Sequence, residues 1–304
     1  MSARRTELLR ISGFAVVAIV FAVTQPLLLI GFPLALLLVT FGPGDRVAAV
    51  VVLVVVGLAL VGERSGLWWF ERGWPLLLGG GFVWVSGRRP KWSFSSQALA
   101  ALGLASIAVA AICALSPALW AEIDAAVAAR ASRAAAGLGQ LLGDSVDGTV
   151  RSAMEKALAL QVKLFPAQIW VSSLGGLGAA VCIRSWLAGE AGIVGPLRSF
   201  RFNDHLVWLW LVGLALLLAP VGEFAERVGS NAALFMGLLY AIRGLAVFLS
   251  LVGGVSVIVG VVTGLVALLL YPVLVMILAA SVLVGLGDTW LNVRERFRKQ
   301  DGGV

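Results

Sequence analysis

One arginine lies inside an apolar stretch, where a charge requires a chemical reason. Arg243 follows Leu-Leu-Tyr-Ala-Ile and precedes Gly-Leu-Ala-Val-Phe-Leu-Ser. A charged residue at the centre of a membrane helix costs about 2.5–3.5 kcal/mol on insertion scales, so it normally faces the protein interior and has a partner. The predicted helix ends six residues later, a rise of roughly 9 Å that a long arginine side chain can partly span by snorkelling. Two interpretations stay open: a snorkelling or ion-paired structural arginine, and a contact to an anionic ligand.

A short polar segment precedes the apolar run at 204–220. It contains Arg201, Asp204 and His205, the last being the one histidine of the chain. Aspartate is a favoured helix N-cap because its carboxylate accepts backbone N–H bonds. Asp204 is therefore predicted either to cap this helix or to form, with Arg201 and His205, a polar cluster at the mouth of a cavity or on a partner surface. Asn231 is predicted to cap its own helix on the opposite side of the membrane.

The C-terminal region adds two further polar candidates, Asp288 and Arg294. They are six positions apart, so they do not face each other on one helix. Basic residues beyond the last apolar run are expected to lie against anionic headgroups. The candidate binding residues are thus Arg243, Asn231, Arg201, Asp204, His205, Asp288 and Arg294.

Catalytic and metal chemistry find little support in the residue types present. The two cysteines lie far apart within apolar runs, and one histidine does not provide the ligand spacing of a zinc site. The apolar runs also contain no paired acidic residues and no nucleophile with a nearby base. We expect no metal, no cofactor, no catalytic residues and no enzymatic activity.

The composition determines the medium in which these side chains are held. Of 304 residues, 60% are hydrophobic and 13% are charged, about half the roughly 25% of a soluble domain. Such a chain is too apolar to be disordered and too poor in polar residues to cover a water-facing surface. The fold class predicted is all-α, a polytopic transmembrane helix bundle solvated by the lipid bilayer.

Apolar runs of suitable length give the candidate spans. A helix crosses the bilayer with about 20 apolar residues, within a range of roughly 17–25. The first two runs are short, and a hairpin that does not fully cross stays open as an alternative. The last run is too long for one helix, and Tyr271-Pro272 is its natural break. About 8–10 spans are predicted, from the runs 11–24, 26–41, 46–62, 66–86, 97–117, 166–188, 204–220, 231–249 and 251–287.

The basic residues predict an orientation. The net charge of +7 is scattered between apolar runs, which argues against nucleic acid as a partner and is typical of cytoplasmic loops. With the N-terminus inside, the short outer loops hold only Arg64, Arg72 and Arg227. We expect a bacterial inner-membrane protein with both termini in the cytoplasm, the inner side holding Arg4, Arg5, Arg10, Arg46, Arg88, Arg89, Lys91, Arg184, Arg198, Arg201, Arg294, Arg296, Arg298 and Lys299.

The segment 118–165 differs from the rest because it is alanine-rich and carries five acidic and five basic residues. It is predicted to be an amphipathic helical hairpin outside the membrane, with its turn at 137–143. It either caps a cavity or simply connects two spans. The predicted divisions are therefore 1–117, 118–165 and 166–304, which hold N-terminal membrane helices, the hairpin, and C-terminal membrane helices with a basic tail.

Glycines occur within several spans, as in 79–81, 175–176 and 253–254. Small residues allow close helix contacts in lipid. The alternative interpretation is that they mark unwound helix segments lining a substrate cavity.

A family resemblance rests on the polar residues above. Pro166 before a span, Phe200-Arg201-Phe202 with Asp204, Asn231, Arg243-Gly244-Leu245-Ala246, and Leu286-Gly287-Asp288 with Asn292 and Arg294 resemble the YybS-like family of bacterial inner-membrane proteins. That family is distantly similar to the substrate-binding subunits of energy-coupling-factor vitamin transporters. The resemblance implies a helical bundle that binds a small molecule and couples to an ATPase module.

Two functional hypotheses remain. The first is a non-enzymatic, membrane-embedded component that binds or transports an unidentified small solute; lacking a Walker motif, it would require an ATPase or coupling module as a partner. The second is a structural or assembly subunit that docks onto another membrane protein complex.

Overall fold

The protein is helical throughout the part that the structure describes. The computed structural model describes residues 28–41, 57, 68–142, 148–188, 195, 197–252 and 271–292. Within these ranges there are nine α-helices, two short 3-10 helices and no strand. The predicted all-α fold is confirmed. The chain divides into two compact units, 1–194 and 195–304.

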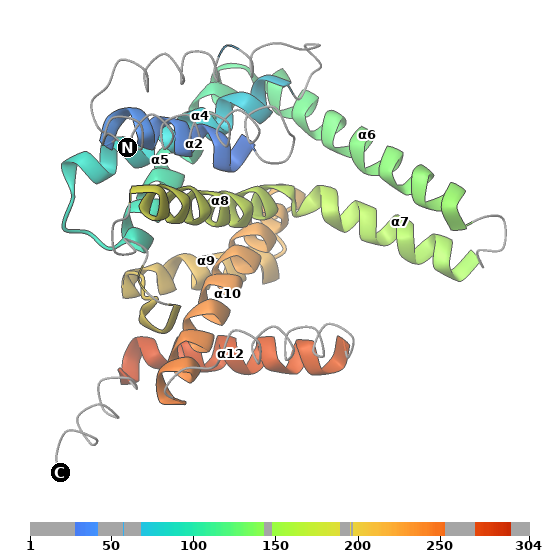
Figure 1. Ribbon diagram of the computed structural model, residues 1–304. Helices are drawn as coiled ribbons and strands as arrows, with labels where there is room; N and C mark the ends of the chain where they lie inside the picture. The colour runs from blue at the N-terminus through green and yellow to red at the C-terminus, as the bar shows by residue number, and fades with distance from the viewer. Residues whose placement is uncertain are drawn as a thin grey trace. The chain divides into compact units, whose positions relative to one another are not determined.

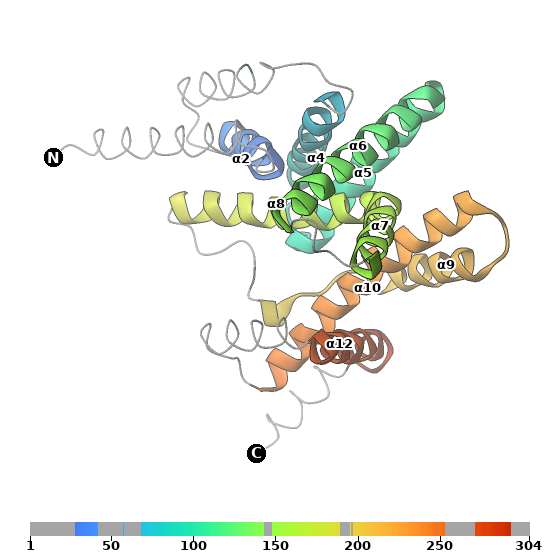
Figure 2. The same cartoon turned by 90° about the vertical axis from the view of Figure 1, so that its right-hand side faces the viewer.

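The first unit is built on four helices, α2 (Leu28–Phe41), α4 (Trp68–Arg88), α5 (Phe94–Leu115) and α8 (Phe165–Ala188). Helix α4 packs against α2 and α5, and α2 also packs against α8 (Figure 2). A buried hydrogen bond joins α4 to α8, where Nε1 of Trp74 donates to Oγ of Ser173 at 2.7 Å.

Glycines make the close contacts of this unit. A Cβ atom on Gly79 would lie 3.0 Å from Cα of Pro33, and one on Gly176 would lie 2.6 Å from the carbonyl oxygen of Leu29. Helix α4 is continuous through Gly79-Gly80-Gly81 and α8 through Gly175-Gly176. At both places the glycines lie in intact helix, and Gly79 and Gly176 serve close packing. The third glycine pair, at 253–254, lies outside the described residues.

The predicted hairpin segment forms two helices that lie side by side, α6 (Pro117–Leu142) and α7 (Gly148–Lys163) (Figure 1). Ile123 and Val127 are buried on the α6 side, against Phe70, Val162 and Phe165 among others. The turn predicted at 137–143 is wrong, because α6 continues through Gly137 to Leu142. A glycine inside a helix costs only about 1 kcal/mol relative to alanine, which neighbouring alanines and leucines offset.

The second unit is organised around the long helix α10 (Glu223–Leu251), which crosses α9 (Val207–Leu218) and α12 (Tyr271–Leu291) (Figure 1). Two 3-10 turns precede α9, η1 (Leu197–Ser199) and η2 (Asp204–Leu206). Helix α10 begins with Glu223 and Glu226 in its first turn, where carboxylates favour the positive end of the helix dipole. The predicted break at Tyr271-Pro272 stays a prediction, because residues 253–270 lie outside the described ones.

Paired glycines also set the crossings of this unit. A Cβ on Gly244 would clash with the backbone of Ser281, and a Cβ on Gly285 would clash with the backbone of Tyr240. Nearer the start of α10, a Cβ on Gly229 would lie 2.6 Å from the carbonyl oxygen of Gly213. The helix backbones therefore touch, an approach that only glycine permits.

Four described helices are long and apolar enough to cross a membrane, at Phe94–Leu115, Phe165–Trp186, Glu223–Leu251 and Pro272–Leu291. The segments Leu28–Phe41 and Asp204–Leu218 are apolar but shorter. The predicted spans 11–24 and 46–62, apart from residue 57, and residues 253–270 of the run 251–287 lie outside the described residues. The total number of spans and the boundaries at 117 and 165 stay predictions.

Candidate functional site

Arg243 is completely buried and paired with two carboxylates. Its Nε donates to Oδ2 of Asp288 at 3.0 Å, and its Nη1 donates to Oδ1 of Asp204 at 2.6 Å. Arg243 comes from α10, Asp288 from the last turn of α12, and Asp204 from η2. The side chain is 0% exposed, so it does not snorkel, and the ion-paired interpretation is the one the geometry supports.

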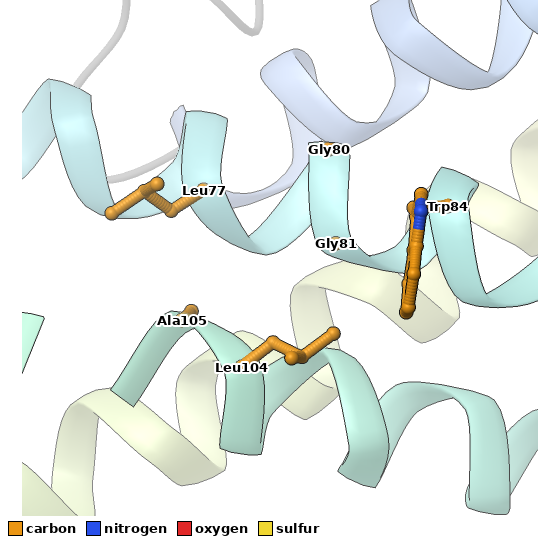
Figure 3. A pocket seen from close by; sticks show the side chains of 6 residues that line it. All are labelled: Leu77, Gly80, Gly81, Trp84, Leu104 and Ala105. Carbon is orange, nitrogen blue, oxygen red and sulfur yellow. The ribbon is translucent and has the colours of Figure 1, made fainter. Parts of the chain in front are cut away.

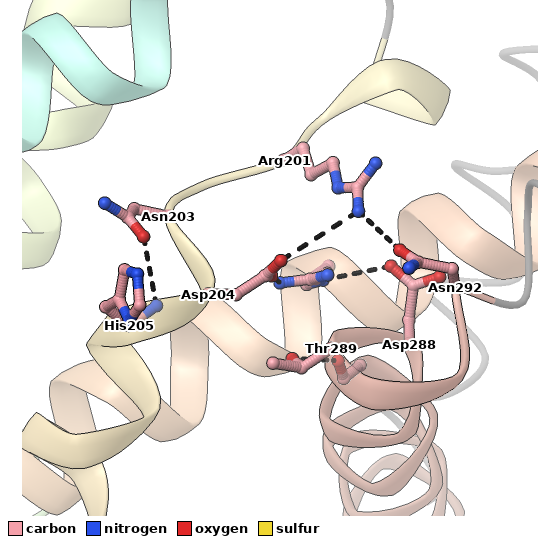
Figure 4. Close-up of polar contacts among 9 residues, drawn as sticks. Arg201, Asn203, Asp204, His205, Asp288, Thr289 and Asn292 are labelled. Atoms are coloured by element: carbon pink, nitrogen blue, oxygen red, sulfur yellow. Dashed lines mark hydrogen bonds and ion pairs between the residues drawn. The ribbon is translucent and has the colours of Figure 1, made fainter.

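A second arginine extends this network to the surface. Nη2 of Arg201 donates to Oδ1 of Asn292 at 2.6 Å and lies 4.0 Å from Oδ2 of Asp204 (Figure 4). The side chains of Arg201 and Asp204 are 43% and 44% exposed. Asp204 therefore bridges a buried arginine and a surface arginine. We refer to Arg201, Asp204, Arg243, Asp288 and Asn292 as the Arg243 cluster.

The electrostatics of the cluster are balanced, since two guanidinium groups meet two carboxylates. A buried charge is tolerated when it is paired and hydrogen-bonded. The ring of Phe202 adds a cation–π contact, with Cζ of Arg243 5.5 Å from its centroid. One donor is left over, because Nη2 of Arg243 is buried and has no hydrogen-bond partner among the described residues.

The glycine crossing of α10 and α12 positions the central pair. Gly244 directly follows Arg243, and Gly285 lies one turn before Asp288. Because the two backbones touch at these glycines, the side chains beside them are brought within bonding distance. The two partners are 45 positions apart in sequence, so the pair depends on how the helices pack.

Several predicted site residues have other roles. Asn203, not Asp204, caps η2, and its Oδ1 accepts a bond from the backbone N–H of His205 at 3.0 Å. Asp204 is instead drawn to Arg243. The imidazole of His205 is exposed, and Figure 4 shows it apart from the arginines and aspartates. It does not complete the predicted cluster.

The predicted cap at Asn231 is wrong. Helix α10 begins eight residues earlier, at Glu223, and Nδ2 of Asn231 donates to the carbonyl oxygen of Arg227 at 2.8 Å within the helix. The first turns of α10 are polar, so no apolar pattern predicted that they are helical. Arg294 lies outside the described residues.

Asn292 is a cluster member that was not among the candidate binding residues. It follows the end of α12 with a φ of 45°. Asparagine is one of the few residues that adopts this left-handed conformation readily, often just after a helix. An asparagine at the end of an apolar helix was the signal available, although it does not indicate Arg201 as the partner.

The amino-acid sequence matches one protein family over most of its length. A family described as "Predicted membrane protein (DUF2232)" matches residues 8–289. The chain belongs to this family. No curated protein and no solved structure matches the chain. As a DUF2232 protein with several long apolar helices, it is a membrane protein embedded in the lipid bilayer.

The finer resemblance to YybS-like proteins and to energy-coupling-factor subunits stays a prediction for this DUF2232 chain. Metal binding has no visible basis in the described ranges, where no group of three or more His, Cys, Asp or Glu side chains is placed to hold an ion. The chemistry available at the Arg243 cluster is charge pairing and hydrogen bonding.

Proposed function

We propose that this DUF2232 protein is a non-enzymatic membrane component that binds a small polar solute at the Arg243 cluster. The carrying observation is the buried Nη2 of Arg243, which lacks a hydrogen-bond partner among the described residues. An unsatisfied buried donor costs about 1–3 kcal/mol, more when it is charged. A solute oxygen that accepts this bond would recover that energy.

The charge balance of the cluster favours one class of solute. Both carboxylates already neutralise the two guanidinium groups, so a bound anion would bring an excess negative charge into a buried site. An uncharged or zwitterionic solute with a carbonyl or hydroxyl oxygen avoids that cost. Arg201 and Asp204 reach the surface and would meet such a solute first. The proposal assigns binding to these groups and no bond-breaking step.

A thermal-shift screen of the detergent-purified protein tests the proposal. Vitamins, nucleobases and simple ions are the probes, and at least one uncharged or zwitterionic compound is expected to raise the unfolding temperature. Arg201→Gln removes the exposed guanidinium of the cluster but keeps both ion pairs of Arg243, and it should weaken that shift. Arg133→Gln makes the same charge change on the exposed side of α6 and should leave it unchanged. No stabilisation by any probe would refute the solute-binding role.

The alternative function is a structural or assembly subunit that docks onto another membrane complex. It is favoured by the way in which Arg243 uses two donors to join α10, α12 and η2, as a fixed structural clamp does. Co-purification from native membranes separates the two proposals. An ATPase with a coupling subunit supports transport, whereas a stoichiometric partner without ATPase activity supports the assembly role.

The proposed location is the bacterial inner membrane with both termini in the cytoplasm. The support is the predicted bias of arginine and lysine between loops. Reporter domains fused separately to the N- and C-terminus should both be active as cytoplasmic reporters and inactive as periplasmic ones. Opposite results at the two ends would overturn this topology without affecting the solute-binding proposal.

A further inference from the structure

A groove separates two helices of the first unit, on the surface of α4 and α5. It has a volume of ≈ 330 Å³, within the range of about 300–1,000 Å³ of small-molecule sites. The side chains that line it are hydrocarbon except for the indole nitrogen of a tryptophan. Figure 3 shows the six residues that form it, Leu77, Gly80, Gly81, Trp84, Leu104 and Ala105.

The groove exists because α4 has a glycine where a side chain would fill it. A Cβ on Gly80 would have no heavy atom within 4 Å. A Cβ on the neighbouring Gly81 would lie 3.5 Å from the carbonyl oxygen of Ala101, so the two helices touch at that point. Trp84, which is 54% exposed, and Leu104, which is 41% exposed, stand on either side of the gap.

One end of the groove is basic. Arg88 lies one helical turn beyond Trp84, and its Cζ is 5.1 Å from the Trp84 ring. Exposed Arg89 and Lys91 follow in the turn that leads to α5. The stretch 72–121 contains no aspartate or glutamate, so no acidic residue in it balances these charges.

The dimensions match one leaflet of a bilayer. Leu77 and Arg88 are eleven residues apart on α4, a rise of roughly 16 Å. The hydrocarbon core of a bilayer is about 30 Å thick, so half of it is about 15 Å. The helical rise from Leu77 to Arg88 is therefore about the depth of one leaflet.

We propose that this groove binds the acyl chain of an anionic phospholipid, with the lipid phosphate held at Arg88. The apolar lining matches the chain, and the basic end matches the headgroup, whose attraction to arginine and lysine is the usual basis of anionic-lipid selectivity. The site lies wholly in the first unit and does not depend on the solute-binding proposal for the Arg243 cluster.

Photocrosslinking in lipid nanodiscs tests the site. The full-length protein is reconstituted in phosphatidylcholine with a trace of phosphatidylglycerol or phosphatidylcholine that carries a diazirine on one acyl chain, and crosslinked peptides are identified by mass spectrometry. Phosphatidylglycerol should label the groove walls at 77–84 and 104–105 more strongly than phosphatidylcholine does. Equal labelling by the two lipids, or labelling spread evenly over the apolar helices, would overturn the proposal.

Two variants address the two halves of the site. Gly80→Phe fills the groove and should abolish labelling of its walls, whereas Gly73→Phe, at another open position two turns earlier on α4, should not. Arg88→Gln should lower the preference for phosphatidylglycerol by about fivefold, the effect of one basic residue at an anionic surface. Undiminished labelling in Gly80→Phe, an unchanged preference in Arg88→Gln, or a protein–protein crosslink in place of a lipid adduct would each contradict the assignment.

Discussion

Nε of Arg243 donates to Oδ2 of Asp288 across 3.0 Å, and these side chains are 0% and 2% exposed. The same guanidinium donates from Nη1 to Asp204, whose carboxylate is 44% exposed. The two carboxylates thus share one arginine but differ in their access to water. This difference predicts unequal costs when either one is neutralised.

Asp288→Ala removes the buried carboxylate that pairs with the buried Arg243. This change should destabilise the protein by about 3–5 kcal/mol. Asp204→Ala should cost much less, because water reaches that position and screens the loss. Unfolding of each purified variant by titration from mild detergent into sodium dodecyl sulfate measures the two losses of stability. Equal losses would contradict the burial difference. The double variant Arg243→Met/Asp288→Leu removes both charges and should be more stable than Asp288→Ala.

Replacing Arg243 should change membrane insertion and folded-state stability in opposite directions. Arg243→Leu removes a charge that costs about 2.5–3.5 kcal/mol at a helix centre, so insertion of the isolated segment 223–251 should improve. The folded protein should nevertheless lose stability, because Asp288 is left buried without its ion-pair partner. An insertion assay with a reporter on the segment, beside unfolding of the full chain, separates the two effects. Parallel changes in both assays would contradict the prediction.

Alanine substitutions at two glycines of α12, Gly285 and Gly287, should change the stability of the protein in opposite directions. Gly285→Ala places a methyl group against the backbone of Tyr240 and should cost about 1–3 kcal/mol, as overpacking does. A Cβ on Gly287 meets nothing within 4 Å, so Gly287→Ala should be neutral or stabilise by up to about 1 kcal/mol through helix propensity. Thermal unfolding in detergent compares the two variants, and a destabilised Gly287→Ala would contradict the crossing geometry.

The hydrogen bond between Trp74 and Ser173 offers a test in the first unit. Ser173→Ala removes the acceptor of a buried indole N–H and should cost about 1–3 kcal/mol. The adjacent Ser172 is exposed, and Ser172→Ala should change stability by less than about 0.5 kcal/mol. The fluorescence of a variant that retains only Trp74 should shift when the acceptor is lost. Equal stability of the two alanine variants would show that the bond contributes nothing.

The amino-acid sequence by itself determined that lipid solvates the chain and that helices form in it, since apolar runs such as 97–117 and 166–188 have the length of a membrane-spanning helix. It also singled out Arg243, because a charge inside an apolar run is rare for energetic reasons. Helix ends that lie outside the apolar runs could not be predicted from hydropathy. The polar start of α10 at Glu223 was missed, and Asn231 was consequently misplaced as a cap.

Only the tertiary structure decided which groups meet Arg243. Asp204 is 39 residues away from it in sequence and Asp288 is 45 residues away. Hydropathy carries no information about the rotation of one helix against another, so neither partner could be assigned from spacing. The contact of Gly244 with Ser281 and of Gly285 with Tyr240 sets that rotation, because side chains larger than hydrogen at these positions would clash with the facing backbone.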